Sequence, residues 1–158
     1  MPHNSTKVFL VDDDPFCRHL VEQAIRNAGY DDVQAFDNGA ACLDALIEEP
    51  AIIFLDQMMG SVSGTDALKA IKRFNPDIYV VLVSGQQQVQ VAVDSLKYGA
   101  FDYVVKDEQL PSRLALVLGK IEKMQALLAS RKPARPRFLS LFSLLPGLLS
   151  MAASRHTH

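Results

Sequence analysis

Three consecutive aspartates, Asp12, Asp13 and Asp14, directly follow an apolar run at residues 8–11. Carboxylates this close repel one another and raise each other's pKa values unless a cation or solvent compensates their charge. Asp14 has a structural explanation, because it precedes Pro15, and an N-cap aspartate followed by proline is typical of a helix start. The other two aspartates have no such explanation, so a bound cation is one way to account for them.

Three other apolar runs are also followed directly by a polar side chain that could take part in chemistry. These side chains are Asp56, Ser84 and Lys106. If the runs are parallel strands, their carboxyl ends share one edge of the sheet, which is where doubly wound folds bind ligands. We therefore expect these groups to converge with Asp12 and Asp13 in one crevice, although they lie far apart in the chain.

The expected crevice combines groups that suit metal binding and phosphoryl transfer. Carboxylates from Asp12, Asp13 and Asp56 offer hard oxygen ligands, which suit Mg²⁺ because that ion keeps several waters and needs few carboxylates. Asp56 stands alone at a predicted central strand and could attack a phosphoryl group as a nucleophile. Mg²⁺, the Lys106 ammonium and the Ser84 hydroxyl are the kinds of group that compensate charge on the transferred phosphoryl oxygens.

Short runs rich in β-branched residues alternate with longer helical patterns along the chain. Apolar residues at i+3 and i+4 spacing predict helices between the runs, including one over residues 40–47 and a strong one over 114–128. Five βα units in series predict an α/β fold, with a doubly wound five-stranded parallel sheet covered by helices on both faces. The predicted strands are residues 7–11, 33–36, 52–55, 79–83 and 102–105.

The composition is that of one globular domain, with 158 residues, 49% hydrophobic and 22% charged. The formal net charge is −2, but residues 131–158 hold five of the 16 basic residues and no acid, so the rest of the chain is acidic. That distribution argues against nucleic-acid binding. Cys17 and Cys42 show no pairing pattern, and residues 1–7 lack the apolar core of a signal peptide, so we expect a cytoplasmic protein with reduced thiols.

The predicted domain organisation has three parts. Residues 1–129 form the α/β domain, residues 130–137 a basic linker interrupted by proline, and residues 138–158 an apolar segment. On a helical wheel this segment has a narrow stripe of small residues and large apolar residues elsewhere, so we expect a helix that binds another surface. The surface that it binds could belong to its own domain, to a second copy of the chain or to a partner protein. It could also be an anionic membrane, because four cations precede the segment.

The order and spacing of these residues resemble the receiver domain of two-component response regulators, especially the single-domain, chemotaxis-type members. The resemblance spans roughly residues 6–125 and implies a flavodoxin-like (βα)5 fold. It rests on an acidic pair, a third aspartate, a glycine eight residues later, a serine and a run that ends in lysine, which are Asp12, Asp13, Asp56, Gly64, Ser84 and residues 98–106.

The resemblance implies a phosphoacceptor switch rather than an enzyme with a separate substrate. Asp56 would accept a phosphoryl group from a sensor histidine kinase or a phosphotransfer protein, and the domain would assist its own phosphoryl transfer and hydrolysis. The resemblance also assigns Mg²⁺ to Asp13, Asp56 and the backbone carbonyl of Met58, with Asp12 assisting. Output would pass through a changed binding surface to a downstream protein target or a second copy of the chain.

Further roles are implied around the phosphoryl group. Ser84 and Lys106 would contact it, and Tyr103 matches the aromatic position whose ring turns inward as the hydroxyl residue shifts. Met58 and Gln86 occupy the positions that flank the water attacking the phosphoaspartate. A flexible apolar methionine can shield the phosphorus without orienting that water, so we expect a long-lived phosphorylated state.

The chain also departs from the family pattern. The loop after the nucleophile has Gly60 where proline is common, which predicts a more mobile loop, and Ser63 where aspartate is common. Gly64 is expected to let this loop turn. Lys106 is followed by Asp107 instead of a proline in a cis bond, and because a non-proline cis bond costs about 2.5–4 kcal/mol, we expect a trans bond.

Alternatives from other classes of function remain open. One is a phosphorylation-independent interaction or dimerisation module that keeps the receiver fold for its surface. A metal-dependent phosphatase is more distant, because Gln57 and Met58 stand where the haloacid-dehalogenase type has a second aspartate. The complete set of reactive side chains favours the phosphorylated switch, since a scaffold has no need to keep groups that repel one another.

Overall fold

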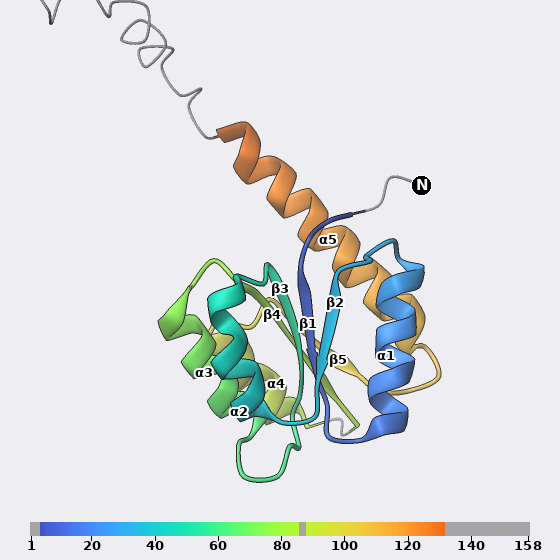
Figure 1. Ribbon diagram of the computed structural model, residues 1–158, viewed down its shortest axis with the longest axis vertical. Helices are drawn as coiled ribbons and strands as arrows, with labels where there is room; N and C mark the ends of the chain where they lie inside the picture. Colours follow the sequence, from blue (N-terminus) through green and yellow to red (C-terminus); the bar gives the residue numbers. More distant parts are fainter. Residues whose placement is uncertain (1–3, 86–87, 132–158) are drawn as a thin grey trace, which may run out of the picture. The chain divides into compact units, whose positions relative to one another are not determined.

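The computed structural model describes residues 4–85 and 88–131. Strands and helices alternate through this part of the chain, as the apolar periodicity predicts (Figure 1). The strands are β1 Val8–Val11, β2 Val33–Phe36, β3 Ile52–Asp56, β4 Tyr79–Ser84 and β5 Asp102–Val105. Two predicted strands end one residue later than expected, so Asp56 and Ser84 are the last residues of β3 and β4.

Helices lie between the strands, as predicted, and the last one extends beyond the predicted range 114–128 at both ends. They are α1 Pro15–Asn27, α2 Gly39–Asp44, α3 Gly64–Phe74, α4 Val89–Lys97 and α5 Leu110–Arg131, with a 3-10 helix, η1 Ala45–Glu48, after α2. The prediction for the start of α1 is confirmed, because the Asp14 carboxylate accepts hydrogen bonds from the backbone N–H groups of Phe16 and Cys17 at 2.9 and 3.3 Å. The single helix predicted over 40–47 is wrong in detail, since its second half is 3-10.

All five strands lie parallel in one sheet with the order β2-β1-β3-β4-β5. This order confirms the doubly wound, flavodoxin-like fold. The direction of winding reverses between β1 and β3, where Val11 pairs with Leu55 at the carboxyl end. Ligands of such folds bind beyond the carboxyl ends of the strands at this reversal.

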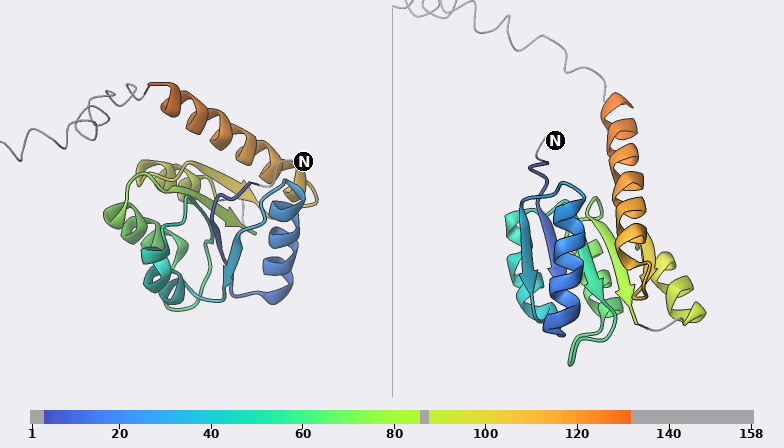
Figure 2. Two further views of the ribbon diagram at one scale, coloured as in Figure 1. Left: turned by 45° about the horizontal axis from the view of Figure 1, so that its top comes forward. Right: turned by 90° about the vertical axis from the view of Figure 1, so that its right-hand side faces the viewer.

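The sheet separates two apolar layers (Figures 1 and 2). Helix α1 and the buried part of α5 cover one face, while α2 and α3 cover the other. Alternate strand residues point to opposite faces, so Val8 and Leu10 of β1 join the first layer and Phe9 and Val11 the second. Because both faces are covered, the strands appear in the sequence as nearly continuous apolar runs.

The chain divides into two units after Glu122, and of the second unit the structure describes only residues 123–131. Helix α5 begins in the first unit, where Leu114 and Ile121 are buried. The predicted apolar segment 138–158, and all but the first two residues of the predicted linker 130–137, lie outside the described residues, so those assignments stay predictions. Within the described part of the chain, no helix has the length and apolar character needed to cross a membrane.

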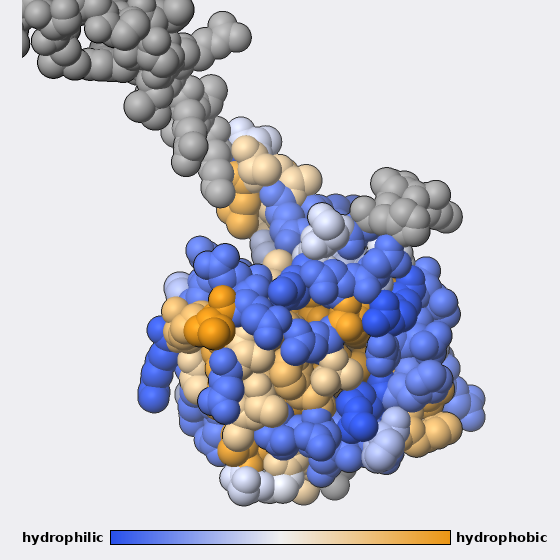
Figure 3. Space-filling model, viewed as in Figure 1, coloured by the Kyte–Doolittle hydropathy of each residue, from blue (hydrophilic) through white to orange (hydrophobic). Residues whose placement is uncertain are grey.

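The surface of the first unit is mixed in character. Viewed as in Figure 1, the α1 side is mostly hydrophilic, and hydrophobic surface gathers toward α2 and α3 (Figure 3). Ile47 in η1 and Phe74 at the end of α3 are exposed. Exposed apolar side chains are common on folded surfaces, so Ile47 and Phe74 need no ligand to explain them.

Two of the departures from the family pattern, at Asp107 and Gly60, have a definite backbone geometry. The peptide bond between Lys106 and Asp107 is trans, as expected, since no described peptide bond is cis. Gly60 has a φ of 59°, in the left-handed region. Glycine adopts this region freely, whereas the proline ring holds φ near about −65°. The loop after β3 therefore has a backbone that proline at this position could not adopt.

Candidate functional site

The carboxyl ends of β1, β3, β4 and β5 bring the predicted reactive side chains to one edge of the sheet. Asp12, Asp56 and Ser84 are buried there, with exposed fractions of 1%, 7% and 2%. Lys106 directly follows β5, and its backbone N–H donates to the Ser84 carbonyl at 2.8 Å. The structure therefore brings together groups from four strand ends, as the parallel-sheet argument predicts.

The three aspartates of this edge form one cluster. Asp12, Asp13 and Asp56 each offer a carboxylate oxygen, and these oxygens lie within 4.8 Å of one another. Asp12 and Asp56 are buried and Asp13 is exposed, so the cluster has a protein side and a solvent side. A hard divalent cation that binds a few carboxylates and keeps several waters fits this donor set. The chemistry of the site is thus compatible with Mg²⁺.

Lys106 supplies the positive charge within this cluster. Its Nζ atom lies 2.6 Å from Asp12 Oδ2 and 3.1 Å from Asp56 Oδ1, and its side chain is 13% exposed. Burial by itself lowers the pKa of Lys106, but the hydrogen bond to Asp12 and the charge of Asp56 outweigh burial and leave the pKa raised. The ammonium is therefore held in its charged form between two buried carboxylates.

The environment of Asp56 disfavours its negative charge. Burial raises the pKa of the Asp56 carboxyl, and the charge of Asp12 raises it further. Lys106 and a backbone hydrogen bond from Met58 act in the opposite direction without cancelling the increase. Additional positive charge beside Asp56 would relieve this imbalance, which is a second reason why a divalent cation fits the site.

Asp12 is held in place by contacts that sequence reasoning missed. Its Oδ1 atom accepts a hydrogen bond from the Asp14 backbone N–H at 2.9 Å. Its backbone carbonyl accepts one from Arg18 Nη1 at 2.7 Å. The sequence position of Arg18, in the first turns of α1, could have predicted this contact, because a long side chain there can reach back to the end of β1. Arg18 thus adds a cation close to the acidic cluster.

Ser84 and Tyr103 lie on the two strands at the β5 edge of the sheet. Ser84 is paired with Val105 in the strand register, and Tyr103 with Leu82. The Tyr103 ring is partly buried and packs against the apolar layer that contains α3. A serine hydroxyl beside the acidic cluster and an aromatic ring one strand away are suitably placed for the predicted switch, whose motion stays a prediction.

Of the two positions predicted to tune hydrolysis, the structure describes only Met58. Met58 lies two residues after Asp56, the last residue of β3, and its side chain is 66% exposed. Its backbone carbonyl as a metal ligand stays a prediction. Gln86 lies outside the described residues, so its predicted role stays a prediction.

The loop after Asp56 packs against the body of the first unit. Met59 is buried in the layer that contains α3. A Cβ atom on Gly39, the first residue of α2, would lie 3.1 Å from Val62 Cγ1, so the loop and α2 approach closely. The greater mobility expected from Gly60 is not tested by these contacts and stays a prediction.

Gly64 has a steric role in this loop. Its φ lies outside the left-handed region, so it does not serve the turn through a left-handed backbone, and its expected role in letting the loop turn stays a prediction. A Cβ atom at this position would lie 2.5 Å from the Asp56 carbonyl oxygen and 2.9 Å from Gln57 Cα. The missing side chain instead allows α3 to begin directly against the backbone of Asp56.

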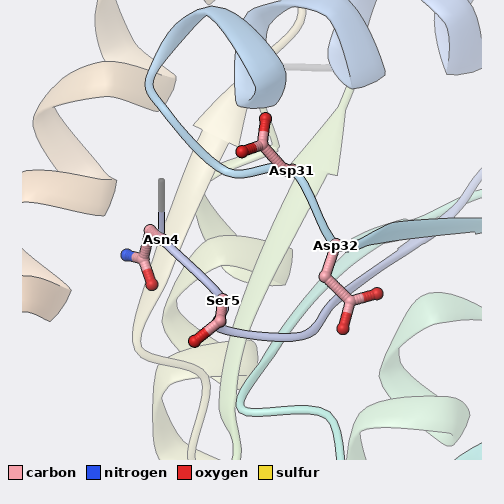
Figure 4. A pocket seen from close by; sticks show the side chains of 4 residues that line it. All are labelled: Asn4, Ser5, Asp31 and Asp32. Atoms are coloured by element: carbon pink, nitrogen blue, oxygen red, sulfur yellow. The ribbon is translucent and has the colours of Figure 1, made fainter. Parts of the chain in front are cut away.

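Two further hollows on the first unit do not have the chemistry of a binding site. One, at the opposite edge of the sheet, is lined by Asn4, Ser5, Asp31 and Asp32 (Figure 4). The carboxylates of its two aspartates point in different directions, so their oxygens do not converge on one point as metal ligands must.

The second hollow lies between α3 and the end of α4 and is lined by Lys69, Lys72, Arg73 and Tyr98. Two of its three cations, Lys72 and Lys69, already have structural partners. Lys72 Nζ donates to the backbone carbonyls of Pro76 and Ile78 at 3.0 and 2.5 Å. Lys69 Nζ lies 4.1 Å from the centre of the Tyr98 ring. Cations at the carboxyl ends of helices also complement the helix dipole, so the charge here needs no bound anion.

A doubly wound sheet with an acidic cluster, a hydroxyl and a lysine at its carboxyl edge defines a phosphoacceptor-type α/β domain. The family model of the response regulator receiver domain matches residues 8–117. Chemotaxis protein CheY of Thermotoga maritima is 32% identical over 118 residues, which cover 74% of this chain and 98% of CheY. The DNA-binding transcriptional regulator NtrC of Escherichia coli is 34% identical over 119 residues, which cover 75% of this chain and 25% of NtrC.

Solved structures give the same result for the fold. The receiver domain of NtrX from Brucella abortus is 27% identical, with a TM-score of 0.67 and coverage of 72% of this chain and 96% of that domain. A response regulator receiver domain protein from Clostridium thermocellum has a TM-score of 0.71 at 22% identity, over 78% of this chain and 98% of that chain. The chain therefore belongs to the receiver domain family of two-component response regulators.

Proposed function

We propose that Asp56 accepts a phosphoryl group from the phosphohistidine of a sensor histidine kinase or a phosphotransfer protein, and that this modification switches the protein. The observation that carries the proposal is the Lys106 ammonium, which reaches both Asp12 and Asp56 beside a cluster of three carboxylates. Burying two carboxylates together is unfavourable unless their charge is compensated. A phosphorylation site uses this arrangement, whereas a scaffold retained for its surface does not.

The transfer makes one bond and breaks one. A carboxylate oxygen of Asp56 forms a bond to phosphorus while the bond from phosphorus to the donor nitrogen breaks. The electron pair of the broken bond stays on the imidazole of the donor, and the product is an acyl phosphate on Asp56. Hydrolysis reverses the modification when a water oxygen attacks phosphorus and the carboxylate leaves with its electron pair. The product is inorganic phosphate as H2PO4⁻, which keeps both protons of the water until it equilibrates with the solvent.

The surrounding groups compensate the charge of the phosphoryl oxygens. Lys106 is already within 3.1 Å of Asp56 Oδ1, so a short movement of its flexible stem would bring it to the new oxygens. Ser84 would donate its hydroxyl proton from the end of β4. Asp12, Asp13 and Asp56, with the backbone carbonyl of Met58, would hold Mg²⁺, which supplies positive charge that neutralises developing negative charge when bound.

The signal would leave the site through neighbouring elements. Movement of Ser84 toward the phosphoryl group would open space into which the Tyr103 ring turns, and the surface around β5 would change for a downstream protein target or a second copy. Met58 and Gln86 would set the rate of hydrolysis by controlling water near the phosphorus. We place the protein in the cytoplasm, where a histidine kinase domain can reach it, and assign it no nucleic-acid partner.

The direct test is incubation of the full chain with acetyl phosphate and Mg²⁺, followed by intact mass spectrometry. We expect a mass gain of one phosphoryl group that requires Mg²⁺ and is absent from the Asp56→Asn protein. Asp66→Asn is a matched control, because Asp66 is an exposed aspartate in the first turn of α3 and should leave the mass gain unchanged. No gain in the parent protein, or a gain that persists in Asp56→Asn, would overturn the assignment and favour the phosphorylation-independent module.

A further inference from the structure

The first turn of α3 lies directly on the backbone that follows Asp56. The Gly64 backbone N–H donates to the Gln57 carbonyl at 3.0 Å. A Cβ atom on Gly64 would come within 2.5 Å of the Asp56 carbonyl oxygen, so the two segments are already in contact. The first turn of α3 and the end of β3 are therefore in direct backbone contact.

A side-chain contact reinforces this packing. Thr65 Oγ1 lies 3.1 Å from Nε2 and 3.2 Å from Oε1 of Gln57, so the hydroxyl can accept from the amide nitrogen or donate to the amide oxygen. Both side chains are partly buried. The amide also lies over Gly64, where an added Cβ would be 3.0 Å from Oε1. The residue after the phosphoacceptor is thus tied to α3 by both its backbone and its side chain.

Asp56 needs such support because the sheet holds it on one side only. In the register, Asp56 is paired with Val83 of β4. On the other side the pairing of β3 with β1 ends one residue earlier, at Leu55 and Val11. A strand end paired on a single side is free to shift unless other contacts hold it. The contacts of Gln57 and Thr65 supply the missing restraint from the α3 side.

We infer that Gln57 and Thr65 are positioning residues that hold the Asp56 carboxylate in register with Lys106, Asp12 and Asp13. This inference rests on the proposed function, because it explains how the proposed phosphoacceptor is kept in place. The two side chains bond to each other and are not proposed to contact the phosphoryl group. Their effect passes through the Asp56–Gln57 backbone, whose displacement would move the carboxylate away from the ammonium that lies 3.1 Å from it.

The chain offers variants that separate this role from general stability. Thr65→Val and Gln57→Leu each remove the contact with little change of volume, and Thr65→Ser keeps the hydroxyl. Ser63→Ala is the matched control, because Ser63 caps the same helix by accepting from the Asp66 backbone N–H at 3.1 Å and takes no part in the hydrogen bond between Gln57 and Thr65. Thermal unfolding of each protein would report the change in stability separately.

The first measurement is the rate of phosphorylation by acetyl phosphate and Mg²⁺ across donor concentrations, read by intact mass. Misplacement of a reacting group by about 1 Å lowers rates strongly, so we expect a fall of about tenfold in the maximal rate for Thr65→Val and for Gln57→Leu. The double variant should fall no further than the single ones, since both remove the same contact. Thr65→Ser should recover the parent rate, and Ser63→Ala should keep it.

The second measurement is Mg²⁺ affinity, from backbone NMR shifts of residues 12 and 13, which does not depend on phosphorylation. We expect several-fold weaker binding in Thr65→Val and Gln57→Leu and parent affinity in Ser63→Ala. Parent values for both quantities in the two variants would overturn the positioning role, and so would equal losses in Ser63→Ala. If the parent is not phosphorylated at Asp56, the proposed function fails, and the Mg²⁺ affinities still decide whether Gln57 and Thr65 position the carboxylate.

Discussion

Lys106 and Asp12 form the shortest ion pair among the described residues, with 2.6 Å between Nζ and Oδ2, and both side chains are largely buried. The ammonium lies closer to Asp12 than to Asp56, from which it is 3.1 Å away. Before phosphorylation, the lysine is therefore shared between a proposed metal ligand and the proposed nucleophile. A phosphoryl group on Asp56 would draw the ammonium from the first toward the second.

Lys106→Ala should destabilise the protein without Mg²⁺ and much less with it. The substitution leaves the buried carboxylates of Asp12 and Asp56 uncompensated, and loss of one partner of a buried pair costs roughly 3–5 kcal/mol. Urea unfolding with and without Mg²⁺ measures the difference. The same variant should lose most of the backbone NMR response to the phosphoryl mimic beryllofluoride, because the ammonium compensates charge that exists only in the modified state.

Lys120→Ala is the control for this experiment. Lys120 pairs with Asp102 at 3.0 Å, but its side chain is 63% exposed, and exposed pairs contribute at most about 1 kcal/mol. We expect near-parent stability and a full beryllofluoride response. A parent-like response in Lys106→Ala would contradict the role assigned to the buried lysine.

Asp56→Asn should stabilise the protein at neutral pH when Mg²⁺ is absent. The folded environment raises the pKa of Asp56, chiefly through burial, so the charged form is less favourable in the folded state than in the unfolded state. The stabilising effect should be on the order of 1 kcal/mol at pH 7. It should shrink as the pH falls through the raised pKa, and disappear below the usual value of 3.8, where Asp56 is protonated in both states.

Thermal unfolding of the parent and Asp56→Asn proteins at several pH values checks this prediction. Added Mg²⁺ should remove the advantage of the asparagine, since the cation compensates the aspartate cluster only in the parent. Greater stability of the parent at pH 7 without Mg²⁺ would show that the carboxylate is not electrostatically strained.

Local sequence patterns were enough to predict the strands and the strand-end chemistry. A continuous apolar run before Asp12 or Asp56 marks a buried parallel strand, and parallel strands share one carboxyl edge, so convergence of these side chains followed from topology. The pairing of Gln57 with Thr65 could not be predicted in this way. It depends on how closely α3 approaches β3, which Gly64 permits through packing and not through any periodicity in the sequence.

Long-range contacts were missed for a similar reason. The Tyr30 hydroxyl donates to Glu122 Oε1 at 2.9 Å, and the two residues are separated by most of the chain. A tyrosine after the end of α1 and a glutamate in α5 belong to no shared motif. Their contact follows only when the sheet order places α1 and α5 on the same face (Figure 2).

Gly64→Ala should destabilise the protein although the residue is helical. The new Cβ would meet the Asp56 carbonyl oxygen at 2.5 Å, and such overpacking costs roughly 1–3 kcal/mol. Gly119→Ala is the contrasting variant, because nothing lies within 4 Å of a Cβ there, and alanine in a helix interior should gain about 0.5–1 kcal/mol over glycine. Urea unfolding compares them, and stabilisation by both alanines would show that α3 does not approach Asp56 so closely.

Tyr30→Phe should destabilise the first unit by roughly 1.5–3 kcal/mol, the usual contribution of a hydrogen bond to a charged partner. The ring is fully buried, and burial together with Glu122 raises the pKa of the Tyr30 phenol well above its usual value. In an alkaline titration followed by ultraviolet absorbance, the parent should therefore show a phenol that ionises well above the usual tyrosine range, and Tyr30→Phe should lose that step. Tyr98→Phe, at a half-exposed ring, should change stability little, and equal losses in both variants would contradict the role of the hydroxyl.

Met58→Asn should shorten the lifetime of phosphorylated Asp56. The Met58 side chain is 66% exposed beside the acidic cluster, and its thioether offers almost no hydrogen bonding to water. An asparagine amide at the same place can accept from and donate to the attacking water, and a better oriented water speeds hydrolysis by a factor of several. The decay is measured by removing acetyl phosphate and following intact mass with time. Met58→Leu keeps an apolar side chain and should decay like the parent, whereas equal lifetimes for the asparagine and leucine variants would show that this position does not control the water.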